Sequence, residues 1–189
     1  MQKSVRGFTL VELMVTLSVL AILLGIAVPS FTGAIASTAV AGHVNTFMAD
    51  ARFARTEAIK RGANVTMCRS DNAETATPTC STAAATDWSA GWLIFEDVDN
   101  NGLFATANND VLIRVQGALT QSGGMATASA TPFNAFTYNA IGRTNNNGSI
   151  TASPRGSLSI DPSYQRILVI DTVGRARWCK TLNGKDCVA

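Results

Sequence analysis

The chain has 189 residues, of which 47% are hydrophobic and 15% are charged, and this length fits one globular domain with an N-terminal arm. Its formal net charge is +2, and acidic and basic side chains balance once Lys3 and Arg6 are set aside, so overall charge does not indicate an acidic partner. The distribution is uneven, since residues 70–113 hold seven acidic side chains and no Lys or Arg, whereas residues 114–189 hold eight basic and three acidic ones. Such an asymmetry can mark an anion-binding face, although by itself it is weak evidence.

The N-terminus is a short basic leader that ends in Gly7, followed by an apolar run from Phe8 to Val28 that is interrupted by one carboxylate, Glu12. The run is long enough to cross a bilayer. A charge inside such a helix costs roughly 3 kcal/mol on insertion scales. We therefore expect Glu12 to have a partner charge.

This segment resembles the N-terminus of type IV pilins and type II secretion pseudopilins. The resemblance implies that a prepilin peptidase cleaves after Gly7 and that the new N-terminal residue, Phe8, is N-methylated. Glu12, at the fifth mature position, would then pair with the amine of a neighbouring subunit in the filament core, because an unpaired buried charge is heavily penalised. A simple membrane anchor or a secretory signal cleaved near residues 34–36 is the alternative. Neither explains Gly7, Phe8 and Glu12 together.

The resemblance also implies an organisation of the chain and a location for it. The expected segments are a leader peptide (1–7), a transmembrane and filament-core helix (8–29), an amphipathic helix of the globular domain (30–62) and a β-rich head (63–189). The subunit is expected in the inner membrane, in contact with its lipids and with the head in the periplasm, before it joins other pilins in an extracellular pilus.

One long helix is predicted from Phe8 to Arg61, about 80 Å long at 1.5 Å per residue. Gly25 and Pro29 should weaken or kink it. The second half carries an apolar stripe at spacings of three and four that should face a sheet, whereas Arg52 and Arg55 lie largely off it. Gly62 is a plausible stop. The stripe consists of Val40, Val44, Phe47, Ala51, Ala54 and Ala58.

After Gly62 the pattern changes to short strands with turn residues between them. The predicted fold class is α+β, with a long helix packed on an antiparallel sheet or small sandwich, the pilin architecture. The linkers 70–87, 118–132 and 142–155 are interpreted as mobile surface loops. The expected strands are Asn64–Cys68, Gly91–Asp97, Val111–Gln116, Phe133–Tyr138, Gly156–Ile160, Arg166–Ile170 and Arg175–Lys180.

Four cysteines form two local groups, Cys68 with Cys80 and Cys179 with Cys187. Because an exported chain meets an oxidising compartment, we predict both local disulfides. A zinc site is the alternative, but the chain has no CxxC motif, and its single histidine, His43, lies in the predicted helix.

The segment WSAGWLIFEDVDNNG at residues 88–102 resembles a stretch of the FimT/GspH branch of minor pilins, in which a GW-x-x-F strand leads into an Asp/Asn/Gly turn. Asp97, Asp99 and Asn101 match the first half of a calcium loop. The twelfth position, Asn108, lacks the bidentate carboxylate. A turn closed by Asx hydrogen bonds is therefore favoured over a calcium site.

The C-terminal segment RILVIDTVGRARWCK at residues 166–180 is predicted to be a hairpin. Arg175 and Arg177 should lie on one strand face, roughly 7 Å apart, with Trp178 packed inward. Gly174 to Arg177 match a GRxR motif that resembles the C-terminal motif of FimT-type minor pilins. The resemblance implies contact with the backbone of double-stranded DNA, and guanidinium groups bind phosphate without reading sequence. The predicted DNA-binding set is Gly174, Arg175, Arg177, Lys180 and Lys185, with Arg143 and Arg155 as weaker candidates.

Solvated edge-strand cations, or ion pairs of these arginines with Asp171 or Asp186, are the alternative interpretation of the motif. The expected function is that of a minor pilin that binds DNA during natural transformation. The alternatives are a structural minor pilin for assembly, twitching or adhesion, and a GspH-type pseudopilin of type II secretion. No cofactor is expected. Enzymatic activity is not expected either, because no nucleophile, base and orienting group can be assembled from these residues.

Overall fold

The computed structural model describes residues 7–83, 87–127, 133–144 and 146–180, apart from the side chains of residues 26–30. The chain divides into two compact units, residues 1–35 and residues 36–189. Helix α1, Leu10–Arg61, belongs to both. It begins two residues after the predicted start and continues without interruption past Gly25 and Pro29. Among the described residues, no helix is both long and apolar enough to cross a membrane.

The C-terminus of α1 ends as the sequence predicts. Gly62 has a φ of 65°, a left-handed conformation that glycine adopts without steric cost. The N–H of Ala63 donates to the carbonyl oxygen of Ala58 at 3.3 Å, which closes the last turn in a Schellman-type motif. Lys60 and Arg61 form ion pairs with Glu57 at 3.4 and 2.8 Å, and Arg61 also reaches Glu96 at 2.8 Å.

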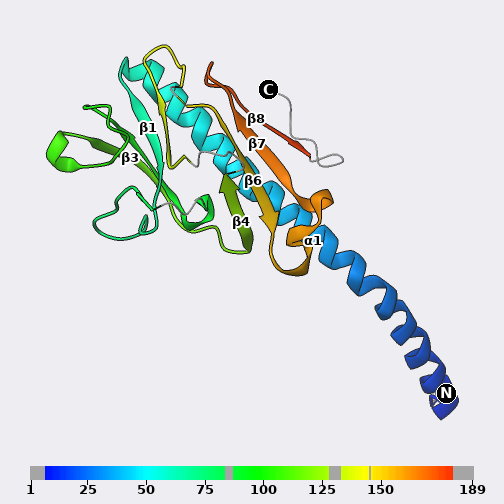
Figure 1. Ribbon diagram of the computed structural model, residues 1–189. Helices are drawn as coiled ribbons and strands as arrows, with labels where there is room; N and C mark the ends of the chain where they lie inside the picture. Colours follow the sequence, from blue (N-terminus) through cyan, green and yellow to red (C-terminus); the bar gives the residue numbers. More distant parts are fainter. Residues whose placement is uncertain (1–6, 84–86, 128–132, 145, 181–189) are drawn as a thin grey trace, which may run out of the picture. The chain divides into compact units, whose positions relative to one another are not determined.

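Two four-stranded antiparallel sheets follow the helix (Figure 1). The first sheet has the order β3-β2-β1-β5 and the second has the order β4-β6-β7-β8. The α+β pilin-type fold predicted from the sequence is thus confirmed. The strands are β1 (Val65–Arg69), β2 (Trp92–Glu96), β3 (Val111–Gln116), β4 (Ser122–Thr127), β5 (Ala135–Tyr138), β6 (Gly148–Pro154), β7 (Arg166–Ile170) and β8 (Ala176–Lys180).

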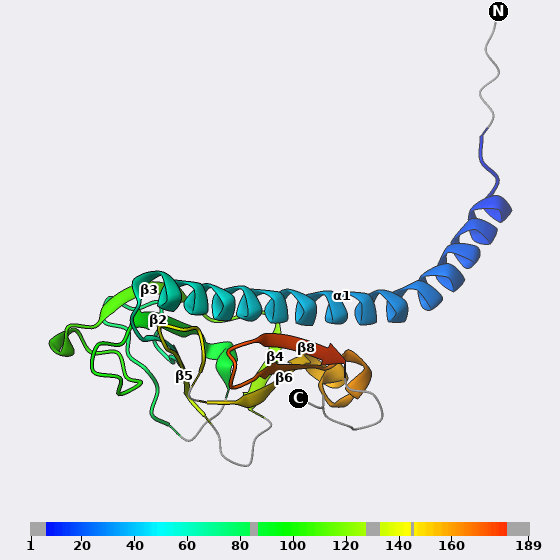
Figure 2. The ribbon, with the colours of Figure 1, turned by 90° about the horizontal axis from the view of Figure 1, so that it is seen from above.

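The second half of α1 packs along both sheets of the 36–189 unit (Figure 2). The predicted stripe is confirmed, since each of its six side chains is at most 1% exposed. Phe47 stands edge-on to Trp88, Trp92 and Phe136, with ring centroids 5.4, 5.3 and 6.3 Å apart. Both hydrophobic clusters lie wholly within residues 36–189. This unit therefore has its own core.

Strand β2 separates the two clusters, because its side chains alternate between them. Trp92 and Ile94 face the main cluster, while Leu93 and Phe95 face a smaller cluster on the other side. A buried polar contact ties α1 to the first sheet, because Asp50 accepts a hydrogen bond from Trp92 Nε1 at 2.9 Å. Its second oxygen pairs with Arg114 at 2.7 Å.

Two predicted loops contain strands, and one predicted strand is wrong. Strand β4 lies within 118–132 and β6 lies within 142–155, where Met125, Ile150 and Ala152 are buried. Residues Gly156–Ile160 form a 3₁₀ helix, η3, although their alternation resembles a strand. Ile160 is 84% exposed, so the apolar positions of this segment do not face a core. Three further short 3₁₀ helices are η1 (Trp88–Ala90), η2 (Thr106–Asn108) and η4 (Pro162–Tyr164).

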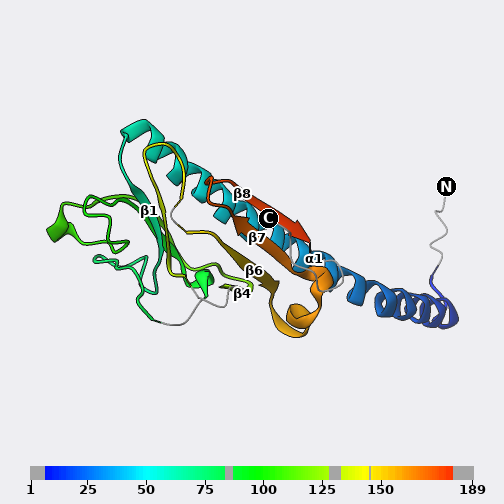
Figure 3. The ribbon, with the colours of Figure 1, turned by 45° about the horizontal axis from the view of Figure 1, so that its top comes forward.

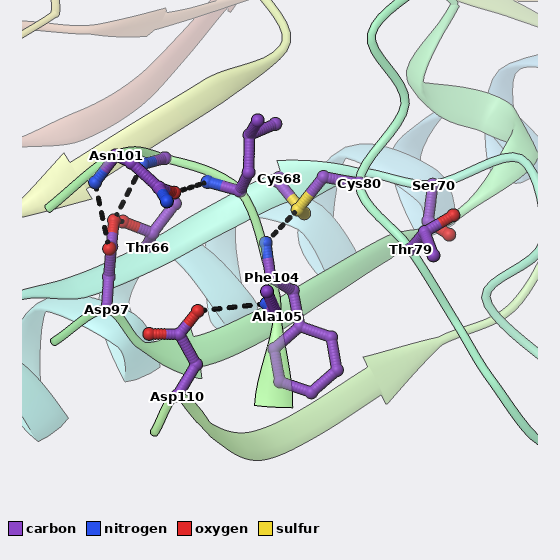
Figure 4. Close-up of a disulfide and its surroundings, with 12 residues drawn as sticks. Thr66, Cys68, Ser70, Thr79, Cys80, Asp97, Asn101, Phe104, Ala105 and Asp110 are labelled. Atoms are coloured by element: carbon purple, nitrogen blue, oxygen red, sulfur yellow. Dashed lines mark hydrogen bonds between the residues drawn. A yellow bond between two sulfur atoms is a disulfide. The ribbon is translucent and has the colours of Figure 1, made fainter. Parts of the chain in front are cut away.

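The predicted disulfide between Cys68 and Cys80 is present (Figure 4). Cys68 lies in the smaller cluster, and the N–H of Phe104 donates to Cys80 Sγ at 3.1 Å. The bond holds the long β1–β2 connection against the first sheet. Cys179 is also disulfide-bonded, and its predicted partner, Cys187, lies outside the described residues.

Candidate nucleic-acid interface

The hairpin that carries the candidate motif is formed by β7 and β8 of the second sheet. These strands pair antiparallel, with Ile170 opposite Ala176 and Val169 opposite Arg177. Strand β8 is an edge strand and runs beside α1 (Figures 1 and 3). The motif therefore lies where the sheet edge meets the helix.

The turn between these strands is closed by Asp171. The N–H of Gly174 donates to the Asp171 carbonyl at 2.8 Å, and the N–H of Asp171 donates to the Arg175 carbonyl at 3.1 Å. The Asp171 carboxylate accepts from the Arg175 backbone N–H and from its Nε, both at 2.9 Å. The ion-pair alternative raised by the sequence is thus present for Arg175 with Asp171.

This ion pair leaves most of Arg175 accessible. The Arg175 side chain is 66% exposed, whereas that of Asp171 is 15% exposed. Burial would raise the pKa of Asp171, but the two hydrogen bonds from Arg175 and the charges of Arg175 and Arg177 outweigh it and lower that pKa. Asp171 engages the guanidinium through Nε, so this hydrogen bond does not use the two terminal amino groups of Arg175.

Gly174 is required by the position of this turn. It is buried, with a φ of 78°, and a Cβ there would overlap the carbonyl oxygen of Gly142. Gly142 belongs to a second turn, in which its N–H donates to the Asn139 carbonyl at 2.8 Å. The N–H of Thr144 also donates to the carbonyl of Thr172 at 3.3 Å. The two turns therefore lie side by side.

A groove runs between this hairpin and the C-terminal part of α1. Its volume is about 630 Å³, and four of its eight lining residues are arginines. None of the lining residues is acidic. The groove is lined by Arg52, Arg55, Thr56 and Ile59 of α1 and by Gly174, Arg175, Ala176 and Arg177 of the hairpin.

The other predicted cations lie at different distances from this groove. Arg143 is exposed in the turn beside the motif. Lys180 lies five residues from Arg175 at the far end of β8, about 16 Å away along an extended strand, where it pairs in register with Arg166. Arg155 lies between the end of β6 and the start of η3. This end of β6 pairs with the start of β7, at Arg166. Lys185 lies outside the described residues.

Trp178 differs from its predicted placement. Its side chain is 45% exposed, and the Arg166 guanidinium lies over its ring at 4.4 Å. Ala176, two residues earlier, does pack against the main cluster. Because β8 is an edge strand, the core extends under its first residue but not under Trp178.

The acidic turn after β2 brings Asp97, Asp99 and Asp110 together, with carboxylate oxygens within 4.8 Å of one another. Both oxygens of every one of these carboxylates already accept hydrogen bonds, mainly from backbone N–H groups. Figure 4 shows Asp97 beside Asn101 and Asp110 beside Ala105. Asp97 also accepts from the Thr66 hydroxyl at 2.7 Å. This arrangement agrees with the Asx-closed turn favoured from the sequence.

At the N-terminus, Gly7 and Phe8 precede α1, and Phe8 is 76% exposed. Glu12 lies in the first turn of the helix and is exposed. Its backbone N–H donates to the Thr9 hydroxyl at 3.3 Å.

Sequence reasoning did not assign Arg52 and Arg55 to the interface. Their spacing of three residues places them on one face of a helix, outside the apolar stripe. Nothing in the sequence shows that this face meets the hairpin, because that contact depends on the order of strands in the second sheet.

Two family models match this chain. The model for the type II transport protein GspH matches residues 43–174, more than half of the chain. The chain belongs to the GspH family. A second model, the prokaryotic N-terminal methylation motif, matches residues 2–28, and such a motif fits a membrane-anchored pilin subunit. The GspH match ends at Gly174 and therefore does not include Arg175 and Arg177.

The fold of this GspH-family chain is also found in a solved structure of another protein. Two crystal structures of the type IV minor pilin FimU from Pseudomonas aeruginosa, in space groups P21 and P65, are similar to it, at 17% and 16% identity. The first covers 78% of this chain and 90% of its own, with a TM-score of 0.51. The second covers 71% and 88%, with a TM-score of 0.48. No curated protein matches the chain.

Proposed function

We propose that this GspH-family chain is a FimT-like minor pilin that binds double-stranded DNA without sequence preference and supports DNA uptake in natural transformation. The observation that carries the proposal is the arginine-lined groove, to which Arg175 and Arg177 of the GRxR motif both contribute. Neutralisation of phosphates supplies affinity that is independent of base sequence. This property is what uptake of arbitrary DNA requires.

The N-terminal segment supports the assembly part of this proposal. Cleavage after Gly7 and methylation of Phe8 by the prepilin peptidase would release a subunit whose apolar helix, residues 8–29, anchors it in the inner membrane. In the pilus, Glu12 would pair with the amine of a neighbouring pilin. The head, with its own core, would then project from the filament and expose the groove.

The Gly174 turn supports the binding part. Asp171 holds the Arg175 guanidinium by Nε and so reduces the conformational freedom that phosphate binding would otherwise remove. The two terminal amino groups remain in the geometry that binds phosphate oxygens in pairs. Asp171 is thus assigned a positioning role for Arg175.

A pseudopilin of a type II secretion system is the second candidate, because the matching family model is that of a type II transport protein. Such a subunit needs no nucleic-acid site. Measured affinity for DNA therefore separates the two candidates.

The test uses the full-length chain in non-ionic detergent and a short fluorescent duplex, with binding followed by anisotropy at several salt concentrations. The double variant Arg175→Gln/Arg177→Gln should lose at least about ten-fold in affinity, since each hydrogen bond to a charged group contributes about 1.5–3 kcal/mol. The control, Lys60→Gln/Arg61→Gln, removes two charges that are already paired with Glu57 and Glu96. If the Arg175→Gln/Arg177→Gln variant binds like the unaltered chain, the assigned DNA site is wrong. If the unaltered chain does not bind the duplex, the proposed function is wrong.

A further inference from the structure

We propose that Arg52 and Arg55 of α1 form a second wall of the DNA site, so that phosphates are bound between the helix and the GRxR hairpin. This inference rests on the proposed function and extends it from a C-terminal motif to a two-sided groove. The groove residues come from segments more than 110 positions apart in the chain.

Arg55 of the helix wall has a buried polar atom, Nε, without a hydrogen-bond partner among the described residues. This atom lies under both turns, 2.9 Å from where a Cβ of Gly142 would be and 3.4 Å from one on Gly174. The two glycines thus leave room for the side chain of Arg55, which reaches the groove beneath the motif.

The surroundings of Arg55 supply little negative charge. The six ion pairs found among the described residues include neither Arg52 nor Arg55. Asp171, the nearby acid, is engaged by Arg175. Burial raises the pKa of the neighbouring Tyr138, so its hydroxyl stays neutral. That hydroxyl is itself buried without a hydrogen-bond partner in the described chain.

A partly buried guanidinium without a counter-charge is unfavourable, and an anion in the groove would relieve this cost. Phosphate suits the site better than a single carboxylate, because its oxygens can accept from several guanidinium groups at once. Arg52 and Arg55 are separated by about 4.5 Å along the helix axis. Arg175 and Arg177 are separated by roughly 7 Å along the strand. The arginine pairs on the helix and on the strand could therefore contact successive phosphates of a DNA backbone that lies in the groove.

The salt dependence of binding provides the readout. For duplex DNA, each phosphate contact contributes about −0.9 to the slope of log affinity against log salt concentration. Loss of Arg52 should therefore make the slope shallower by about 0.9 and lower the affinity several-fold. Loss of Arg52 and Arg55 together should change the slope by about twice as much.

The experiment compares Arg52→Gln, Arg55→Gln and the double variant of the full-length chain in non-ionic detergent, with the fluorescent duplex as the probe. Lys60→Gln is the matched control, because it removes one charge from the same helix but outside the groove. Arg52 is exposed, so its variant should fold normally. The melting temperature of Arg55→Gln shows whether this variant is folded. A loss of DNA binding supports the helix wall only if the melting temperature is unchanged, since an unfolded variant would also lose binding.

The outcomes separate the two proposals. If Arg175→Gln/Arg177→Gln weakens binding while Arg52→Gln keeps the affinity and slope of Lys60→Gln, the helix wall is wrong and the function stands. If the unaltered chain does not bind the duplex, the proposed function is wrong.

Discussion

Gly174 lies against the backbone carbonyl oxygen of Gly142. The two glycines belong to two neighbouring turns, residues 171–175 and residues 139–143. This contact explains the glycine of the GRxR motif, since a side chain at position 174 would separate the two turns. The separation would displace Arg175 from the groove wall. The glycine of the motif thus positions the arginine that follows it.

A comparison of two alanine substitutions tests this contact. Gly174 and Gly156 have nearly equal φ values, 78° and 81°, but nothing lies within 4 Å of a Cβ at Gly156. Gly156→Ala should cost about 1–2 kcal/mol in unfolding free energy, from backbone strain. Gly174→Ala should cost about 1–3 kcal/mol more because of overlap with Gly142. Urea denaturation measures both values, and equal losses would contradict the packing role of Gly174.

The contact of Asp50 with Trp92 and Arg114 leads to a prediction about stability. Asp50 is 4% exposed and accepts hydrogen bonds from both residues. Asp50→Ala should lower the unfolding free energy by about 1–3 kcal/mol, because it leaves a buried indole N–H without an acceptor. Asp50→Asn keeps an oxygen for Trp92 and should cost less. Similar losses in chemical denaturation for the two variants would show that the Trp92 hydrogen bond is unimportant.

The sequence predicted those parts of the fold in which local pattern and burial agree. The apolar stripe of α1 has strong periodicity, and the strands β2, β3 and β7 are short runs rich in apolar residues. Strand β6 was missed because it is built of small and polar residues, although Ile150 and Ala152 alternate with Ser149 and Thr151. Strand β4 contains Gly123 and Gly124, which have low strand propensity. Both strands are stabilised by hydrogen bonds to neighbouring strands of the second sheet. The local sequence pattern does not predict this pairing.

The candidate site divides in the same way. The hairpin and the proximity of Arg175 to Arg177 follow from turn residues and strand alternation, which are local properties. The contribution of Arg52 and Arg55 depends on β8 lying at the sheet edge beside α1. Such a contact between distant segments requires the tertiary structure.

Acid should destabilise the head through carboxylates whose pKa values are lowered in the folded state. Burial would raise the pKa of Asp87, but backbone hydrogen bonds from Met125 and Ser89 outweigh it, so the pKa lies below 3.8. The pKa of Asp171 is lowered similarly. Because the unfolded chain binds these protons more readily, their stabilisation is present well above the ordinary pKa of aspartate and is lost as pH falls through the lower pKa values of the folded chain.

Urea unfolding at a series of pH values measures this effect. The unfolding free energy should vary little from about pH 7 to pH 5 and fall steeply below the ordinary pKa of aspartate. Asp87→Asn should make the acid limb shallower, because it removes one of the titrating groups. An acid limb unchanged in this variant would show that Asp87 does not contribute.

Calcium should not stabilise the turn at residues 97–102. Both oxygens of Asp97, Asp99 and Asp110 are engaged by hydrogen bonds. A bound ion would have to replace several of them, whereas calcium sites supply six to eight oxygens that are available to the metal. The melting temperature should therefore be the same with calcium or with a chelator. A rise that saturates with calcium concentration would contradict the Asx-closed turn.

Removal of the Cys68–Cys80 disulfide should destabilise the head by about 3 kcal/mol, because the bond closes a loop of 12 residues in the unfolded chain and restricts it. Cys68 is also fully buried in the smaller cluster. The double variant Cys68→Ala/Cys80→Ala should show this loss in urea denaturation. Cys179→Ala/Cys187→Ala is the matched control and should lose less, since Cys179 lies half-buried on the edge strand β8. Equal losses of unfolding free energy in the two variants would contradict the assignment of the larger structural role to Cys68 and Cys80.

Both predicted disulfides can be tested by thiol labelling of the denatured, non-reduced chain, which should find no free cysteine. A labelled cysteine would contradict the prediction.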